Sequence, residues 1–441
     1  MDTQPSFRVI ESGVGRHLFV VDGSRLYDIA GDATDEAIRA AIEALSPPGR
    51  RRIDNVPLAP PSLQTLSLNV AQACNMSCGY CYAGEGQFGG KARLMRADTA
   101  RAAVDRLIAE AAPGTDLVIG FMGGEPFLNR ALLHEITPYA VEAARACGHK
   151  VRFSLTTNAT LLRPEDITLM AAHDFQVAVS IDGGRAANNA LRLIHNGDSA
   201  YDRILGGLDL FESYGRPRHL SARLTVTPLS HNLVEQLEHV LSLGFDSAGF
   251  APVLVSPDPK LAFSEADFAW FLNEMVECGE RAKRSIICKR RYPFSNFETA
   301  LQQLERGSHR PYACGAGAAY LSVNADGELF ACHRLVDDKD YRFGDVWSGS
   351  DYEARARHLA ASHVDTQQPC RSCWARYLCG GGCHHEVKHR GRPGCDYIRG
   401  WLEFCLAAYC EVKQHAPEYF EHPQSHFSAQ PDAATSTGND T

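Results

Sequence analysis

The sequence lacks both the long apolar runs of a membrane protein and the positive charge of a nucleic-acid-binding protein. No apolar stretch reaches the roughly 20 residues that span a bilayer, and residues 1–13 lack the basic-then-apolar layout of a signal peptide. The 44 Lys and Arg residues are outnumbered by 53 Asp and Glu residues, so the net charge is −9. A field of this sign argues against nucleic acid and against an anionic membrane as partners. We therefore expect a cytoplasmic protein, and disulfides are rare in that reducing compartment.

Cysteine, by contrast, is abundant, with 15 residues in a chain of 441. Clustered cysteines in a reducing compartment are typical of metal ligands. Cys74, Cys78 and Cys81 form a C-x3-C-x2-C motif directly after the alternating apolar run 63–70. Three thiolates at this spacing can hold three irons of a cubane iron–sulfur cluster and leave the fourth iron without a protein ligand. A structural zinc knuckle and buried free thiols are the alternatives.

The composition divides the chain into four regions. Residues 1–62 carry short strand-like runs, a helical stretch at 35–45 and a Pro-rich linker, while residues 414–441 end in small polar residues and are predicted to be disordered. Residues 63–304 alternate strand-like and amphipathic helical runs in six units. This predicts an α/β fold with parallel strands, a partial (β/α)6 TIM barrel. Residues 305–413 are rich in Gly and Cys and bury little apolar area, so clusters or metals must stabilise them.

Polar residues stand where the predicted strands end, and barrels of this kind place their active sites at those ends. The sequence Gly-Gly-Glu-Pro at 123–126 follows the second predicted strand. Its glycines let the backbone approach a ligand, and its carbonyls together with Glu125 can accept hydrogen bonds from a cationic amine. The later strands end in, or are followed by, Ser154, Thr157, Asn158, Ser180, Asp182, Arg192 and Arg223. Any one of these residues could equally cap a helix or satisfy a turn.

Four motifs in this order resemble the radical S-adenosylmethionine (SAM) superfamily: C-x3-C-x2-C with Tyr80 before its last cysteine, GGEP, TTNAT and SIDGG. The resemblance implies that Cys74, Cys78 and Cys81 hold a [4Fe-4S] cluster. It implies contacts to SAM from Tyr80, Gly123, Gly124, Glu125, Ser154, Asn158, Ser180, Asp182 and Arg192. Among these, Arg192 is the better candidate for the methionine carboxylate, because a guanidinium binds a carboxylate bidentately. The implied chemistry is reductive cleavage of SAM to a 5′-deoxyadenosyl radical, which abstracts a hydrogen atom from a substrate.

Seven further cysteines follow in the C-terminal region: Cys314, Cys332, Cys370, Cys373, Cys379, Cys383 and Cys395. Their order resembles the SPASM extension of radical enzymes that modify peptides, which implies two auxiliary [4Fe-4S] clusters and three clusters in all. By that pattern one cluster takes Cys370, Cys373, Cys379 and Cys395. The other takes Cys314, Cys332 and Cys383. A zinc ribbon is the alternative for the four-cysteine run.

The set of Cys314, Cys332 and Cys383 is one ligand short, since Ser308 stands where fully ligated relatives have a further cysteine. Cys288 or another distant thiol could complete it, as could water or a different side chain. An open iron could instead bind a substrate cysteine thiolate and aim its sulfur at a carbon radical. We expect most cysteines without ligand spacing (Cys147, Cys278, Cys288, Cys405 and Cys410) to be buried free thiols. His384 and His385 are expected to line the surface of the Gly-rich loop.

Residues 1–62 resemble winged-helix-like modules that bind leader peptides by strand addition at a sheet edge, although a domain that only buttresses the barrel is the alternative. The whole chain most resembles maturases that form cysteine thioether cross-links, including those of quinohemoprotein amine dehydrogenase and of six-cysteine ranthipeptides. The resemblance implies a cysteine-containing peptide or small protein with a leader as substrate, and a flavodoxin- or ferredoxin-type electron donor. The rival reaction is formylglycine formation by an anaerobic sulfatase maturase. The rival class is a non-enzymatic iron–sulfur electron carrier or a zinc scaffold.

Overall fold

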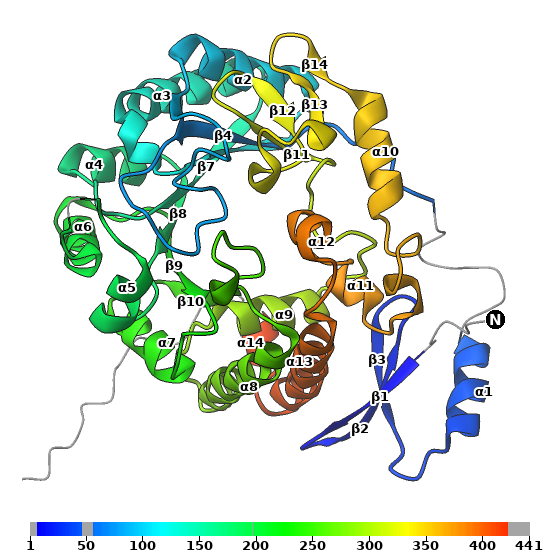
Figure 1. Cartoon of the computed structure of the whole chain (residues 1–441). Coiled ribbons are helices and arrows are strands. Elements are labelled where there is room, and N and C mark those ends of the chain that lie inside the picture. The colour runs from blue at the N-terminus through cyan, green and yellow to red at the C-terminus, as the bar shows by residue number, and fades with distance from the viewer. Residues whose placement is uncertain (1–6, 46–55, 196, 422–441) are drawn as a thin grey trace, which may run out of the picture.

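The computed structural model describes residues 7–45, 56–195 and 197–421, and six parallel strands form its centre. These strands pair side by side in chain order, and the helices that connect them lie on the outside of the ring (Figure 1). They are β4 (Thr65–Gln72), β6 (Asp116–Gly123), β7 (Lys150–Thr157), β8 (Phe175–Ser180), β9 (His219–Val226) and β10 (Ser247–Pro252). The predicted partial barrel of six β–α units is confirmed.

The outer layer consists of amphipathic helices whose apolar sides pack on the sheet. They are α2 (Ala97–Glu110), α3 (Arg130–Ala146), α4 (Pro164–Ala172), α5 (Arg185–Leu191), α6 (Ala200–Tyr214) and α7 (Leu233–Ser242). Between sheet and helices, the rings of Phe121, Phe153 and Phe175 stack with centroids 4.9 to 6.1 Å apart. No helix within the described ranges combines the length and apolarity that crossing a membrane requires.

The inner face of the barrel has a different character from this apolar outer face. Along β9, Leu220, Ala222, Leu224 and Val226 are buried in the core. Because strand side chains alternate, Ser221, Arg223 and Thr225 point to the opposite face, into the ring. The interior therefore carries polar side chains, as expected of a surface that receives a ligand rather than of a packed core.

The C-terminal elements extend the sheet and close the ring. β11 (Tyr320–Val323) pairs in parallel with β4, and β12 (Glu328–Phe330), β13 (Arg342–Asp345) and β14 (Gly349–Ser350) continue the sheet in antiparallel fashion. The segments that follow are α10 (Tyr352–Ser362), α11 (Arg376–Cys379) and α12 (His384–Arg390). They lie on the side of the ring opposite β7 and β8 (Figure 1).

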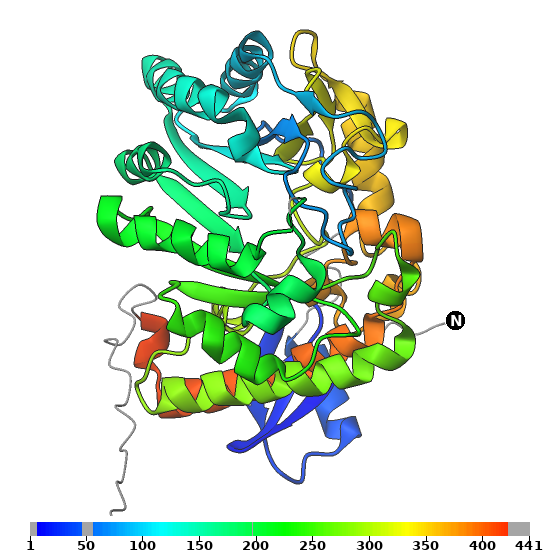
Figure 2. The ribbon, with the colours of Figure 1, turned by 60° about the vertical axis from the view of Figure 1, so that its left-hand side comes forward.

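The last long helix anchors the C-terminal region to the barrel. α13 (Cys395–His415) lies alongside α8 (Glu265–Ile287), as Figure 2 shows, and Trp401 packs on Phe294 and on Phe297 of α9 (Ser295–Glu305). The predicted disorder from residue 414 onward is wrong at its start. α13 continues to His415, and α14 (Glu418–Glu421) buries Tyr419 because its ring reaches the core. The rest of that predicted tail, residues 422–441, lies outside the described residues.

A separate small sheet lies at the N-terminal end of the described chain. β1 (Phe7–Ser12), β2 (Gly15–Val20) and β3 (Arg25–Ile29) form an antiparallel sheet with β2 in the middle, and α1 (Asp35–Leu45) follows. One face buries Phe19 against the cysteine-rich region, where its ring meets Trp374 at 6.0 Å. The other face packs Leu18 and Val20 on α1. The predicted Pro-rich linker, residues 56–62, forms neither helix nor strand, and residues 46–55 before it lie outside the described residues.

Candidate functional site

The first cysteine triplet lies in the loop that leaves the carboxyl end of β4. Cys74 interacts electrostatically with Cys78 and Cys81, and the Cys81 amide donates to the Cys78 carbonyl at 3.0 Å. Burial raises the pKa of Cys74 to about 12 and also raises the pKa of Cys78. The structure therefore brings three half-buried thiols together, and at Cys74 and Cys78 burial disfavours the thiolate form.

The glycine pair of the GGEP sequence is required by contact with this cysteine loop. A Cβ on Gly124 would lie 2.1 Å from the Ala73 carbonyl oxygen, and one on Gly123, whose φ is +142°, would lie 2.3 Å from the Ala71 carbonyl oxygen. The Gly124 amide donates to Ala71 at 2.8 Å, and the Glu125 amide donates to Ala73 at 2.9 Å. The glycines therefore let two backbone segments touch, and this contact fixes the cysteine loop against β6.

Glu125 ties the same loop to the end of β7. Its buried carboxylate accepts hydrogen bonds from the Phe127 amide at 3.1 Å, the Thr157 hydroxyl at 2.8 Å and the Asn158 amide at 2.7 Å. Burial raises the pKa of Glu125 to about 7. The Asn158 side chain in turn donates to Asn75 at 2.9 Å and lies 3.9 Å from the Cys74 sulfur. Since protein donors engage both carboxylate oxygens, Glu125 positions the loops that surround the thiols.

A second buried group joins Tyr80, Asp182 and Arg192. The Tyr80 hydroxyl donates to Asp182, and an Arg192 Nη donates to the Tyr80 oxygen at 2.8 Å. Arg192 also lies 3.9 Å from the Asp182 carboxylate, whose other oxygen accepts from the Thr225 amide at 2.9 Å. Within the described chain, the buried Nε of Arg192 has no hydrogen-bond partner. A buried guanidinium with an unused N–H group fits an anionic ligand such as a carboxylate.

The remaining predicted contacts line the interior beside these groups. Ser154 lies on the inner face of β7 next to Gly120, and Ser180 lies on the inner face of β8 opposite Arg223 in the strand register. A cavity of about 320 Å³ opens at the carboxyl ends of β8 to β10. Asp182, Leu191, Thr225 and Phe250 are among the residues that line it. Of the predicted SAM contacts, Asp182 lines this cavity.

Among the C-terminal thiols, electrostatic interactions link members of each of the two predicted sets. Cys332 interacts electrostatically with Cys314 and Cys383. Cys379 does so with Cys370, Cys373 and Cys395. Cys288, the candidate fourth ligand, is exposed at the end of α8. Within the described chain, the thiols that interact electrostatically with Cys332 are Cys314 and Cys383, and Cys288 is not among them.

The spacing of these thiols bears on which metal group they fit. Within the described ranges, no three His, Cys, Asp or Glu side chains converge closely enough to share a single metal ion. The thiolates of a four-iron cluster bind separate irons, so a set that serves a cluster does not have to converge on one point. The donor chemistry of all three sets, thiols alone, fits iron–sulfur clusters.

A polar cluster between the first triplet and the Cys314 set was not predicted. Tyr82, the residue after Cys81, interacts electrostatically with Cys81 and with Cys332, and the Arg334 guanidinium lies 4.9 Å from its ring centroid. Arg334 forms an ion pair with Glu386 at 2.7 Å. The only feature of the sequence that points to this cluster is that Tyr82 comes one residue after Cys81 and Arg334 comes two residues after Cys332.

The expected surface position of His385 is wrong. Its ring is buried and packs edge-on against Tyr82, with centroids 5.6 Å apart. The burial arises because this side of α12 packs on Tyr82 of the first cysteine loop. His384 is half-buried beside His358, with ring centroids 4.8 Å apart.

Comparisons with known proteins show what the chain is similar to. Residues 68–242 match the family model of the radical SAM superfamily. A serine-type anaerobic sulfatase-maturating enzyme of Klebsiella aerogenes is 25% identical over 349 residues, covering 76% of this chain and 83% of that protein. The mycofactocin maturase MftC of Mycolicibacterium smegmatis is 24% identical over 354 residues, covering 76% and 83%.

Solved structures show the same fold. The native sulfatase-maturating enzyme anSMEcpe with bound AdoMet has a TM-score of 0.69 at 19% identity, covering 80% of this chain and 99% of that one. SuiB of Streptococcus suis bound to its precursor peptide SuiA has a TM-score of 0.54 at 14% identity, covering 89% and 98%. The chain therefore has the fold of these structures, its residues 68–242 are similar to the radical SAM superfamily, and maturases are among its relatives in sequence.

Proposed function

We propose that this enzyme forms thioether cross-links between a cysteine and a side-chain carbon within one peptide or small protein. The observation that carries the proposal is the three-thiol set of Cys314, Cys332 and Cys383. It faces the first triplet across Tyr82, which interacts with Cys81 on one side and Cys332 on the other. A substrate in the barrel interior would lie between the two sets.

The chain's own residues have three tasks in this reaction. Cys74, Cys78 and Cys81 would hold a [4Fe-4S] cluster, and Arg192 would hold the SAM carboxylate with its unused Nε–H. When bound, SAM and that cluster supply a radical that removes one hydrogen atom from the substrate carbon. Glu125 and the glycine pair keep the cysteine loop in place. The polar interior of β9 receives the peptide.

The reaction balances as a two-hydrogen oxidation of the substrate. The carbon loses a hydrogen atom to the deoxyadenosyl radical, which becomes 5′-deoxyadenosine. The cysteine thiol loses its proton, the C–S bond forms, and one electron passes to an acceptor of the iron–sulfur class. Cys370, Cys373, Cys379 and Cys395 would hold such an acceptor, and a flavodoxin or ferredoxin would be the external electron carrier.

The N-terminal sheet supplies a candidate position for a leader peptide. β3 is an edge strand of that sheet, while β1, at the other edge, packs on α13. An extended leader would add to β3 as a further strand through main-chain hydrogen bonds. The opposite faces are already covered by α1 and by the cysteine-rich region, which leaves the β3 edge for recognition.

Formylglycine formation is the second candidate, favoured by the similarity to sulfatase-maturating enzymes. Coexpression with a small cysteine-rich peptide encoded beside the gene, followed by mass spectrometry, separates the two reactions. A thioether removes two hydrogens and keeps the sulfur, whereas formylglycine made from cysteine loses the sulfur. Zinc without iron after anaerobic reconstitution, or no 5′-deoxyadenosine under reduction, would show that neither reaction occurs.

Matched cysteine variants assign the two triplets. Cys74→Ser should abolish release of 5′-deoxyadenosine, because the radical can no longer be formed. Cys314→Ser should keep that release and abolish the cross-link. Cys147→Ser is the control, since Cys147 is exposed at the end of α3 and belongs to none of the three sets. Normal cross-linking by Cys314→Ser would refute the role proposed for the second triplet.

A further inference from the structure

The loop that follows the last barrel strand closes on itself. Residues 253–263, here named the β10 loop, connect β10 to α8. The Phe263 amide donates to the Val253 carbonyl at 2.9 Å, so the two ends of the loop are held together. Its tip, residues 257–260, is exposed. A compact loop of this length whose ends meet is a frequent functional element, and such a loop can open while the rest of the chain stays folded.

One side of the β10 loop covers the first cysteine loop. Leu261 is buried and packs in one apolar cluster with Val253 and Tyr80, and Cys78 packs against that cluster. A Cβ on Gly79 would lie 3.2 Å from a methyl carbon of Leu261. Tyr80 also belongs to the buried group that contains the candidate partner of the SAM carboxylate. The β10 loop therefore lies over the candidate SAM site.

A single arginine of the cysteine-rich region also holds the β10 loop. The two terminal nitrogens of Arg390 donate to the Leu254 and Phe263 carbonyls, each at 3.0 Å. One nitrogen thus binds each end of the loop, and the planar fork of a guanidinium suits two acceptors at once. Within the described residues, the hydrogen bonds that join positions 254–262 to other parts of the chain come from Arg390 alone.

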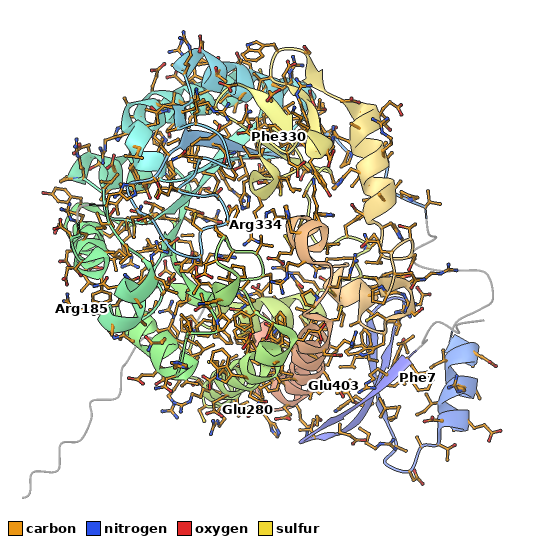
Figure 3. All side chains as sticks on the ribbon, in the orientation of Figure 1. Phe7, Arg185, Glu280, Phe330, Arg334 and Glu403 are labelled. Carbon is orange, nitrogen blue, oxygen red and sulfur yellow. The ribbon has the colours of Figure 1, made fainter. Side chains whose placement is uncertain are left out.

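Arg390 is the last residue of α12, the helix that begins directly after Cys383 of the second triplet. α12 is itself fixed in place by the ion pair of Glu386 with Arg334, at 2.7 Å. Arg334 lies beside α12 in the centre of the ring and comes two residues after Cys332 (Figure 3). The helix that holds the β10 loop is therefore anchored to segments that carry two thiols of the second triplet.

These contacts form a continuous path between the surroundings of the two triplets. Leu261 touches the first cysteine loop, Arg390 holds both ends of the β10 loop, and α12 leads back to Cys383. None of the side chains that make the contacts to the β10 loop is a candidate cluster ligand. Opening of the loop would remove the apolar cover of Tyr80 and admit water to the candidate SAM site.

We propose that Arg390 is a positioning residue that keeps the β10 loop closed over the SAM site and couples this closure to α12. The inference rests on the proposed function, which places SAM beneath the loop and the peptide between the two triplets. A closed loop excludes water and small molecules from the radical, so that the peptide is its hydrogen donor. With the loop open, the radical takes its hydrogen atom from a thiol or buffer molecule instead.

The first test measures the loop itself and not the activity. The full chain is reconstituted with iron and sulfide, and hydrogen–deuterium exchange is followed by mass spectrometry on peptides that cover residues 253–263. The amides of Leu261, Ala262 and Phe263 report on opening, because each donates a hydrogen bond within the loop. Arg390→Gln should raise their exchange about 10-fold or more, since two hydrogen bonds from a charged group are lost. Arg390→Lys should restore part of the protection, because an ammonium keeps the charge without the fork.

The second test measures how much 5′-deoxyadenosine is released for each cross-link formed. It uses the same reconstituted chain with SAM and a cysteine-containing peptide that the wild type modifies. The ratio should rise about 3- to 10-fold in Arg390→Gln and move in the same direction in Leu261→Ala, which loosens the loop from its other contact. Because both act through one loop, the double variant should fall short of the combined single effects. Arg357→Gln, at an exposed position of α10, is the control.

Each outcome decides a separate point. Unchanged exchange in Arg390→Gln would overturn the inference and leave the proposed function standing. Raised exchange with a wild-type product ratio would show that Arg390 only stabilises the fold, and would overturn its positioning role. Fully additive effects in the double variant would overturn the action through one loop. Absence of cross-linking in the wild type would refute the proposed function, whereas the exchange experiment would still report whether Arg390 holds the loop.

Discussion

The contact between the GGEP loop and the cysteine loop makes Gly124→Ala an informative substitution. The added Cβ would lie 2.1 Å from the Ala73 carbonyl oxygen, 2.5 Å from its carbon and 2.9 Å from the Cys74 amide nitrogen. All three atoms are backbone, so no side chain can rotate away and the cysteine loop itself must move. The backbone at Gly124 is not in the left-handed region, so the effect is steric and not conformational.

Two magnitudes follow from this geometry. Overpacking of this kind costs about 1–3 kcal/mol of stability. Displacement of the catalytic groups by about 1 Å lowers the rate by about 100-fold. We therefore expect Gly124→Ala to unfold at lower urea concentration than the wild type, and to release 5′-deoxyadenosine at least about 10-fold more slowly. The iron bound after reconstitution should fall as well, because Cys74 moves with the loop.

Gly206→Ala is the matched control for this substitution. Gly206 lies within α6, has no positive φ, and an added Cβ would meet no atom within 4 Å. Alanine is a better helix former than glycine, so this variant should be more stable by about 0.5–1 kcal/mol and fully active. The reasoning would be refuted if Gly124→Ala matched Gly206→Ala in both urea unfolding and deoxyadenosine release.

Three further substitutions test the surroundings of the site. Glu125→Gln should flatten the pH dependence of stability. Burial raises the native pKa of Glu125 to about 7, so the free energy of unfolding of the wild type falls as the pH rises from about 4.5 to 7. Urea unfolding measured across that range should therefore change less with pH in the variant. Ser308→Cys should lower cross-linking and leave deoxyadenosine release intact if a fourth thiol closes the second set; unchanged cross-linking measured by mass spectrometry would argue against an open position there. Phe19→Ala should destabilise the chain by about 3–5 kcal/mol, because Phe19 is 1% exposed and packs on Trp374. Thermal unfolding measures the loss, and Leu58→Ala, at an exposed position, is the control.

The barrel was predictable from the sequence because its signals are local. The alternation of apolar and polar residues on strands such as β9, and the helical spacing of apolar residues on helices such as α2, are each contained in one short segment. Six repeats of the two patterns leave few alternative folds. The three thiol sets stay predictions, which rest on the resemblance to known families. The role of Gly123 and Gly124 was predicted incompletely, since the backbone that they approach belongs to residues 71–74 on a different strand.

The polar cluster around Tyr82 could not be predicted, because its members come from three separate segments of the chain. Tyr82 leaves the first cysteine loop, Arg334 follows β12, and Glu386 lies on α12. No spacing in the sequence links them. Their meeting depends on β11 pairing with β4, which folds the cysteine-rich region over the open side of the barrel. The expected position of His385 was wrong for the same reason. The polar sequence HHEVKHR suggests a surface helix, and nothing in it indicates that His385 packs on Tyr82.

The same pairing explains why one interior can serve both halves of the proposed reaction. β11 continues the barrel sheet next to β4, which leads into the loop with Cys74, so Cys314 and Cys332 of the second triplet flank an extension of the sheet that positions the first. A flexible tether between separate domains would let the two triplets vary in separation, whereas a shared sheet fixes it. A fixed separation restricts which atoms of a peptide can lie between a radical source and a thiol-binding position. The selectivity of the enzyme for one carbon of its substrate should therefore depend on the β4–β11 register as much as on the residues that touch the peptide.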